Sequence, residues 1–98
     1  MSLTSYSELP KSGSATAGAA QSDIFTLGGE TENACNGVVH IQVASTEAAG
    51  VEVIALGDTV GILVANDGVA VPFFIDDLKK IEVKRQGGAD ITFRYFAF

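Results

Sequence analysis

The feature that most constrains this chain is a succession of short apolar stretches, each closed by turn residues, that begins at residue 23 and continues to the last residue. Residues 38–44, 81–85 and 91–98 alternate apolar and polar side chains, a spacing that indicates half-buried β-strands. No stretch carries a helical apolar stripe long enough to compete with this pattern. The sequence therefore predicts an all-β fold, a small antiparallel β-sandwich or partly open barrel of six to eight short strands.

Turn residues predict how several of these strands connect. Asn66-Asp67-Gly68 is a strong turn, because Asn, Asp and Gly tolerate positive φ. Residues 59–71 are therefore expected to form a β-hairpin around it. Gly87-Gly88 is expected to connect the strands at 81–85 and 91–98 in the same way.

Three shorter segments complete the predicted map of the strands. Residues 24–27 are apolar and end at a glycine pair, which suggests a short strand. Pro72 has no N–H to donate to a sheet, so it is expected at an edge, a bulge or a strand end. Residues 76–80 are charged and predict a turn, or one helical turn begun by Asp76.

Residues 1–22 differ from everything that follows. They are mainly Ser, Thr, Ala and Gly, and a segment that buries so little apolar surface is expected to be extended or disordered. The folded domain is then expected to comprise residues 23–98. Leu3, Tyr6 and Leu9 are the exceptions, spaced three residues apart. Two interpretations stay open: a disordered tail, or an arm that orders by placing these three side chains on a neighbouring subunit.

Charge argues against a nucleic-acid partner. The chain has 12 acidic and 6 basic residues and a net charge of −6, whereas binding to a polyanion needs several Lys or Arg contacts. The one basic cluster consists of Lys79, Lys80, Lys84 and Arg85. Acidic residues interrupt and precede this cluster, so a mixed solvated surface is the simpler interpretation.

Residues that could carry catalysis or bind a metal are few and lack partners. Cys35 is the only cysteine and His40 the only histidine, so the spacing of zinc ligands is absent. A Cys35–His40 nucleophile pair would need the base within hydrogen-bond reach and a third group to orient it, and nothing in the sequence indicates either. Asp76 and Asp77 are adjacent and are better interpreted as turn formers than as a general acid–base pair. We therefore expect no catalytic site, no metal and no cofactor.

Neither a membrane segment nor a secretory signal is expected. No apolar run approaches the roughly 20 residues that a membrane helix needs. The first residues do not place a basic segment before an apolar one, as a signal peptide does. A single cysteine excludes an intrachain disulfide, which fits maturation in a reducing cytoplasm.

The final segment has unusual side chains on its outward face. One face carries the apolar residues of an ordinary sandwich strand, and the other carries Thr92, Arg94, Phe96 and Phe98. Two explanations for Phe96 and Phe98 stay open. The protein's own loops could cover both rings, or the rings could belong to a subunit interface, where aromatic residues are enriched.

Three features of residues 58–98 follow one another in an order known from a group of phage proteins. A hairpin over residues 61–69 precedes a polar turn at 76–80, and two alternating strands close the chain. This order resembles that of small β-sandwich proteins on the virions of tailed bacteriophages. A start rich in Ser, Ala and Gly is compatible with the resemblance, because virion proteins often use extended arms to contact neighbours.

The resemblance implies a capsid decoration, or cement, protein that is made in the host cytoplasm and resides on the virion. Its implied partners are the major capsid protein or another virion protein, and further copies of itself, with a trimer as the natural arrangement. A head–tail or tail component is the alternative within this class. The alternative from another class is a carbohydrate- or ligand-binding β-module, although such a module would be expected to display surface Trp or clustered Tyr. This chain has no Trp and only Tyr6 and Tyr95.

Overall fold

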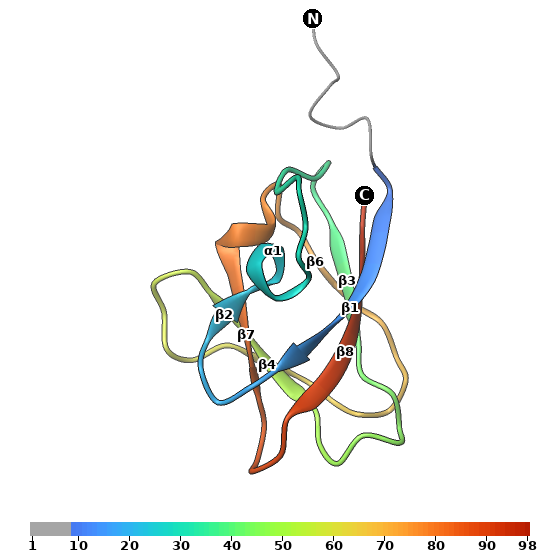
Figure 1. Cartoon of the computed structure of the whole chain (residues 1–98), viewed down its shortest axis with the longest axis vertical. Coiled ribbons are helices and arrows are strands. Elements are labelled where there is room, and N and C mark those ends of the chain that lie inside the picture. The colour runs from blue at the N-terminus through green and yellow to red at the C-terminus, as the bar shows by residue number, and fades with distance from the viewer. Residues whose placement is uncertain (1–8) are drawn as a thin grey trace, which may run out of the picture.

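The computed structural model in Figure 1 describes residues 9–98 as two antiparallel four-stranded sheets packed face to face. The predicted all-β sandwich is therefore confirmed. The elements in chain order are β1 (Lys11–Ala17), β2 (Ser22–Asp23), α1 (Ile24–Leu27), β3 (Val39–Gln42), β4 (Val51–Ala55), β5 (Ile62–Val64), β6 (Val71–Phe73), the 3₁₀ turn η2 (Leu78–Lys80), β7 (Ile81–Arg85) and β8 (Ile91–Ala97).

The strand order identifies the architecture. The first sheet has the order β1-β8-β3-β6 and the second sheet has the order β2-β7-β4-β5. The antiparallel pairs β1·β8, β2·β7, β3·β6 and β4·β5 are nested one inside the next, as in a long hairpin that has been rolled up. Eight strands wound in this way form a jelly roll. Its two sheets enclose one core, to which both sheets, α1 and η2 contribute buried apolar side chains.

The prediction that residues 1–22 form an extended or disordered arm is wrong from residue 11 onward. Residues 11–17 form β1, which pairs with β8 over seven positions from Lys11↔Ala97 to Ala17↔Ile91. The small side chains of Ala15 and Ala17 are buried in the core. Pairing with β8 orders this segment, although its composition predicted disorder. The backbone hydrogen bonds of a strand ladder do not depend on large apolar side chains.

The predicted hairpin over residues 59–71 is also wrong. β5 pairs with β4 in the second sheet, whereas β6 pairs with β3 in the first. The turn at residues 66–68 therefore carries the chain from one sheet to the other, and Gly68 N donates to Val43 O at 2.9 Å. The glycine pair after β7 does the same, since β7 and β8 belong to different sheets. Turn residues set a local reversal of the chain, but they do not choose the strand with which each side pairs.

Two short segments differ in detail from the predicted map. Residues 24–27 form a helical turn instead of a strand, because the Asp23 carboxylate accepts a hydrogen bond from Thr26 N at 2.7 Å and caps it. The predicted turn at 76–80 contains η2, capped by Asp77 rather than Asp76 through Lys79 N. Pro72 lies in β6 at the edge of the first sheet, one of the positions predicted for it.

Two glycines allow close contact between the strands of the β4·β5 pair. A Cβ atom at Gly61 would collide with the carbonyl oxygen of Val53 and lie 2.8 Å from Ile54 Cα. A Cβ atom at Gly50 would collide with the carbonyl oxygen of Val64. In both cases the neighbour is backbone, which cannot rotate away as a side chain can. The position of β5 against β4 therefore requires glycine at both sites.

We predict that Gly61→Ala lowers the free energy of unfolding by about 1–3 kcal/mol, the usual cost of overpacking. Gly88→Ala is the matched control, since a Cβ atom there would meet nothing within 4 Å and its φ is not positive. The control should change stability by no more than about 1 kcal/mol. Urea denaturation followed by circular dichroism measures both, and equal stabilities for the two variants would contradict the prediction.

Candidate functional site

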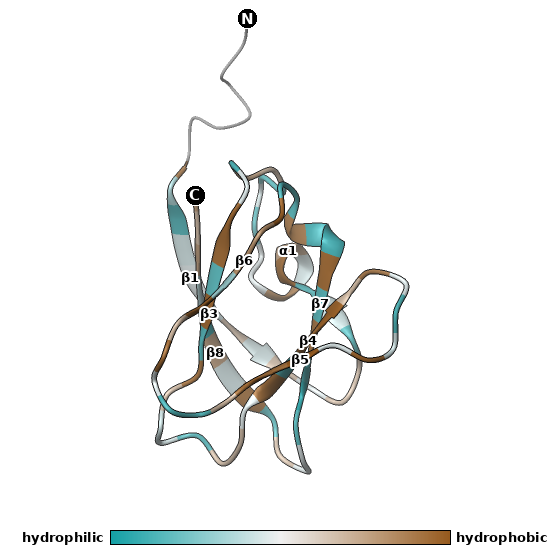
Figure 2. Cartoon of the chain, turned by 180° about the vertical axis from the view of Figure 1, so that it is seen from behind, coloured by the Kyte–Doolittle hydropathy of each residue, from teal (hydrophilic) through white to brown (hydrophobic). Residues whose placement is uncertain are grey.

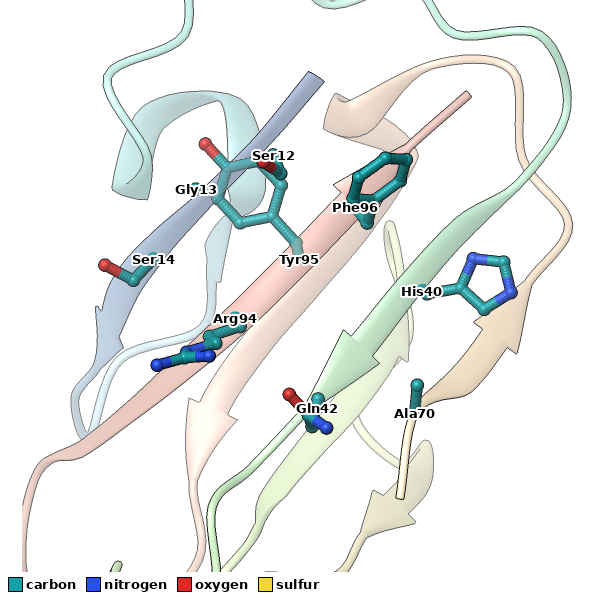
Figure 3. Close-up of a pocket in the computed structure, with 9 residues that line it drawn as sticks. All are labelled: Ser12, Gly13, Ser14, His40, Gln42, Ala70, Arg94, Tyr95 and Phe96. Carbon is teal, nitrogen blue, oxygen red and sulfur yellow. The ribbon is translucent and has the colours of Figure 1, made fainter. Parts of the chain in front are cut away.

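Two rows of outward-facing side chains cross the first sheet and border a hollow on its outer face. Strand register places Phe96 of β8 between Ser12 of β1 and His40 of β3. Two residues along, Arg94 lies between Ser14 and Gln42 in the same way. We call the depression over these rows the first-sheet hollow (Figure 3). It has a volume of about 500 Å³ and is lined by Ser12, Gly13, Ser14, His40, Gln42, Ala70, Arg94, Tyr95 and Phe96.

Small side chains on β1 and larger ones on β3 and β8 give the hollow its chemistry. Ser12, Gly13 and Ser14 leave space above β1, whereas Figure 3 shows His40 and Gln42 on β3 beside Phe96 and Arg94 on β8. The lining contains hydroxyl, amide, imidazole and guanidinium groups but no carboxylate. The surface can therefore offer hydrogen bonds, one fixed positive charge and one aromatic ring.

An aromatic cluster of Phe96, Phe98 and His40 lies at one end of the hollow. The ring centroids of Phe96 and Phe98 are 4.9 Å apart, and His40 meets Phe98 edge-on at 5.6 Å. Phe96 and Phe98 are 40% and 42% exposed, so the protein's own loops cover them only in part. The structure thus brings these two candidate interface residues together and leaves apolar surface open there, while the interface itself stays a prediction.

Arg94 differs from every other basic side chain in the chain. All six Lys and Arg residues are in the described part, and five of them have a partner. Four of these side chains lie within 4 Å of a carboxylate, in the pairs Lys11–Glu30, Lys80–Asp76, Lys84–Glu52 and Arg85–Asp90. Lys79 lies 4.6 Å from the centroid of the Phe25 ring. Among the described residues, Arg94 has no hydrogen-bond or ion-pair partner. Each side chain of the predicted basic cluster therefore has a carboxylate or an aromatic ring beside it. Arg94, which lacks such a partner among the described residues, lies on the first sheet.

A second surface, which we call the apolar edge, lies at the β5 end of the second sheet. It consists of Leu56, Val60, Ile62 and Leu63, each between 57% and 78% exposed. Figure 2 shows the apolar colouring of this part of the chain, and Figure 1 shows the β4–β5 loop projecting from the side of the sandwich. Val60, Ile62 and Val64 alternate along the sequence as residues of one strand face do, but only Val64 is buried. Strand alternation cannot reveal that β5 is the last strand of its sheet, with a neighbour on one side only.

Hydrogen bonds hold the apolar edge in position. Leu56 N donates to Lys80 O at 2.8 Å, and the Gln21 side chain donates to Asp58 O at 3.1 Å. Gly61 N donates to the Glu52 carboxylate at 2.8 Å. The loop is therefore tied to η2, to the segment before β2 and to β4. A surface held in this way loses little conformational entropy when a partner covers it.

A partly buried polar network fastens the first sheet to the segment after α1. The Tyr95 hydroxyl donates to the Glu30 carboxylate, whose other oxygen lies 3.9 Å from Lys11 Nζ. The phenol ring fills the space beside Gly13 and Gly28, where an added Cβ atom would collide with it. Burial, and then the hydrogen bond to Glu30, hold the pKa of Tyr95 well above its ordinary value of 10.0. The network fixes β1 against β8, the two strands that carry one side of the hollow.

The remaining candidate residues are not brought into one site. Leu9 is half-buried against the domain's own core, and Leu3 and Tyr6 lie outside the described residues. Cys35 is buried, with its thiol 3.1 Å from Ile75 O, and burial raises its pKa. His40 instead contacts Phe98 on the outer face of the first sheet. The structure therefore does not assemble the Cys35–His40 pair.

Residues 9–98 hold no group of three or more His, Cys, Asp or Glu side chains arranged to bind a metal ion. None of the helices in that part of the chain is long and apolar enough to cross a membrane.

Comparison with known proteins returns no matching family model, no matching curated protein and no matching solved structure.

We predict that Tyr95→Phe lowers the free energy of unfolding by about 1–3 kcal/mol, because the mostly buried Glu30 carboxylate loses its hydroxyl donor. Urea denaturation of Tyr95→Phe, Glu30→Ala and the double variant would measure their coupling. Strictly additive effects of the two substitutions would contradict a direct interaction between the side chains.

We also predict that Tyr95 makes stability depend on pH in alkaline solution. Its pKa is raised by folding, so its contribution is fully present below the unfolded value near 10.0 and is lost as the pH rises above that value. Unfolding free energies measured between pH 9 and pH 11 should fall less steeply for Tyr95→Phe than for the wild type. Identical slopes would contradict the assignment.

Proposed function

We propose that this chain is a non-enzymatic structural protein of a phage virion, a capsid decoration protein that bridges neighbouring capsid subunits. The observation that carries the proposal is the presence of two separate exposed apolar surfaces on one small rigid domain. Several exposed apolar side chains gathered at one place on a domain are typical of a site of protein association. Of the features in residues 58–98 that resemble those of phage virion proteins, the polar turn and the two alternating strands are present, whereas the hairpin is not.

The apolar edge supports attachment to another protein subunit. β5 has a free side along which its backbone N–H and C=O groups can pair with an incoming strand. Natural edge strands are commonly protected by Lys, Pro or a covering segment. From Thr59 to Asn66 there is no charged residue and no proline. The ion pair between Glu52 and Lys84 joins β4 and β7 of the same sheet, so it places no charged side chain on β5.

The aromatic cluster supports a second contact. It lies on the first sheet, whereas the apolar edge belongs to the second (Figure 1). A domain with two surfaces on different sheets can contact two neighbours at once, which is what bridging requires. On a symmetric shell, many such weak contacts give avidity without a large interface for each copy.

The jelly-roll architecture is compatible with this role but does not establish it. Jelly rolls occur in viral capsid proteins, lectins and cupins, so the fold alone leaves the function open. Within the proposal, the chain associates with the major capsid protein or another virion protein and with copies of itself, with a trimer as the natural arrangement. Its location is then the virion surface, reached after synthesis in the host cytoplasm.

The test is binding to empty capsid shells of the phage that encodes the chain. The wild-type protein should sediment with the shells and raise the temperature at which they disrupt. We predict that Leu63→Lys weakens shell binding at least about tenfold, because a charge would be buried in the contact. Ala89→Lys, an exposed position in the connection from β7 to β8, is the control for the added charge and should bind as the wild type does.

Other outcomes separate the alternatives. Binding to tail or neck assemblies without binding to shells would replace the decoration role with a head–tail or tail role. Equal losses for Leu63→Lys and Ala89→Lys would show that the apolar edge is not the contact. A protein that binds neither shells nor tails would refute the virion proposal.

A further inference from the structure

We infer that the first-sheet hollow is a binding site for a carboxylate-bearing saccharide, in which Arg94 pairs with the carboxylate and Phe96 packs against the sugar ring. In this acidic protein, five of the six basic side chains have a partner. Each of the other basic side chains has a carboxylate or an aromatic ring beside it, and Arg94 alone among them lacks a partner in the described part of the chain. The backbone of Arg94 is held in place, because β8 is paired on both sides.

The groups around Arg94 select an anionic ligand of modest charge. The chain has 12 acidic residues, yet none of those in the described part lines the hollow. A guanidinium group presents a planar fork of N–H donors that matches a carboxylate with two parallel hydrogen bonds. The net charge of −6 would repel a long polyanion, whereas one carboxylate can be accommodated beside one unpaired arginine.

The hydrogen-bonding groups of the hollow suit a polyhydroxylated molecule. Ser12 and Ser14 on one side and His40 and Gln42 on the other offer both donors and acceptors. Phe96 adds a half-exposed aromatic ring two residues from Arg94 on the same strand face, about 7 Å along the strand. A pyranose ring carries an apolar C–H face, a rim of hydroxyl groups and, in a sugar acid, a carboxylate a few bonds away. It can therefore meet the ring, the polar groups and the guanidinium together.

Position within the sheet argues against an extended peptide as the ligand. A peptide strand is commonly recognised by backbone pairing along a free sheet edge. The hollow lies instead over β8, whose neighbours β1 and β3 already occupy both of its sides. Recognition in the hollow must therefore come from side chains. The edge strands are β1 and β6 in the first sheet and β2 and β5 in the second, and β8 is not among them.

This site shares Phe96 and His40 with the aromatic cluster, to which the proposed function assigns a second contact, but Arg94 belongs to neither apolar surface. Shell binding is assigned in part to the apolar edge, which lies on the second sheet, and Arg94 is not part of that edge. Loss of shell binding in Leu63→Lys and loss of saccharide binding in Arg94→Gln would therefore be separate results.

Isothermal titration of the full chain with trigalacturonate tests the inference. Its methyl-esterified counterpart, in which each carboxylate is neutral, is the matched ligand control. The wild type should bind the acid more tightly than the ester. Arg94→Gln should weaken binding of the acid about tenfold or more and abolish the preference for it. Phe96→Ala should weaken binding of both ligands, and amide chemical shifts should change at β8 and β3 when the acid is added.

Lys80→Gln is the matched protein control, because it removes one positive charge in η2, outside the hollow, where Lys80 pairs with Asp76. It should bind trigalacturonate as the wild type does. Equal weakening by Lys80→Gln and Arg94→Gln would show general electrostatic attraction and overturn the site. The inference also fails if trigalacturonate does not bind at millimolar concentration. It fails too if inorganic phosphate, or a short acidic peptide used as a competitor, binds the hollow as tightly as the saccharide.

Discussion

The pairing of β8 with strands on both of its sides is the interaction on which the rest of the structure depends. β8 contacts β1 over seven positions and β3 over four, so the last residues of the chain hold an early strand and a middle strand together. Its inward residues, Ile91, Phe93, Tyr95 and Ala97, are all buried. Its outward residues carry the hollow and the aromatic cluster. One strand thus supplies both the centre of the core and the centre of the candidate binding surface.

The two surfaces differ in what they can recognise because they differ in position within their sheets. The apolar edge is the last strand of the second sheet, so its backbone as well as its side chains can take part in contacts. The hollow lies over a central strand, where backbone groups are already paired and only side chains face outward. The first suits association with another polypeptide. The second suits a small ligand matched to individual polar groups.

Local patterns predicted the strands well and the connections poorly. Alternation correctly indicated β3, β7 and β8, including the outward position of Phe96. It did not indicate β1, since Ser12, Gly13 and Ser14 have neither apolar character nor β propensity. The turn at residues 66–68 was predicted from its Asn and Gly, but as a hairpin rather than a passage between sheets. In the same way, the final aromatic residues were identified from sequence, whereas the unpaired state of Arg94 was not.

The sequence by itself determined the fold class, the strands with clear alternation and the outward aromatic residues at the chain end. These follow from the two-residue period of a strand, which is a local property of the chain. The tertiary structure alone decided that residues 11–17 are part of the sandwich, that β5 is an open edge and that Arg94 has no side-chain partner among residues 9–98. Each of these features depends on which distant segment of the chain lies beside it, as Ala97 lies beside Lys11 in the β1·β8 pair. That choice is set by the burial of the whole core and by long-range pairing, which no short stretch of sequence encodes.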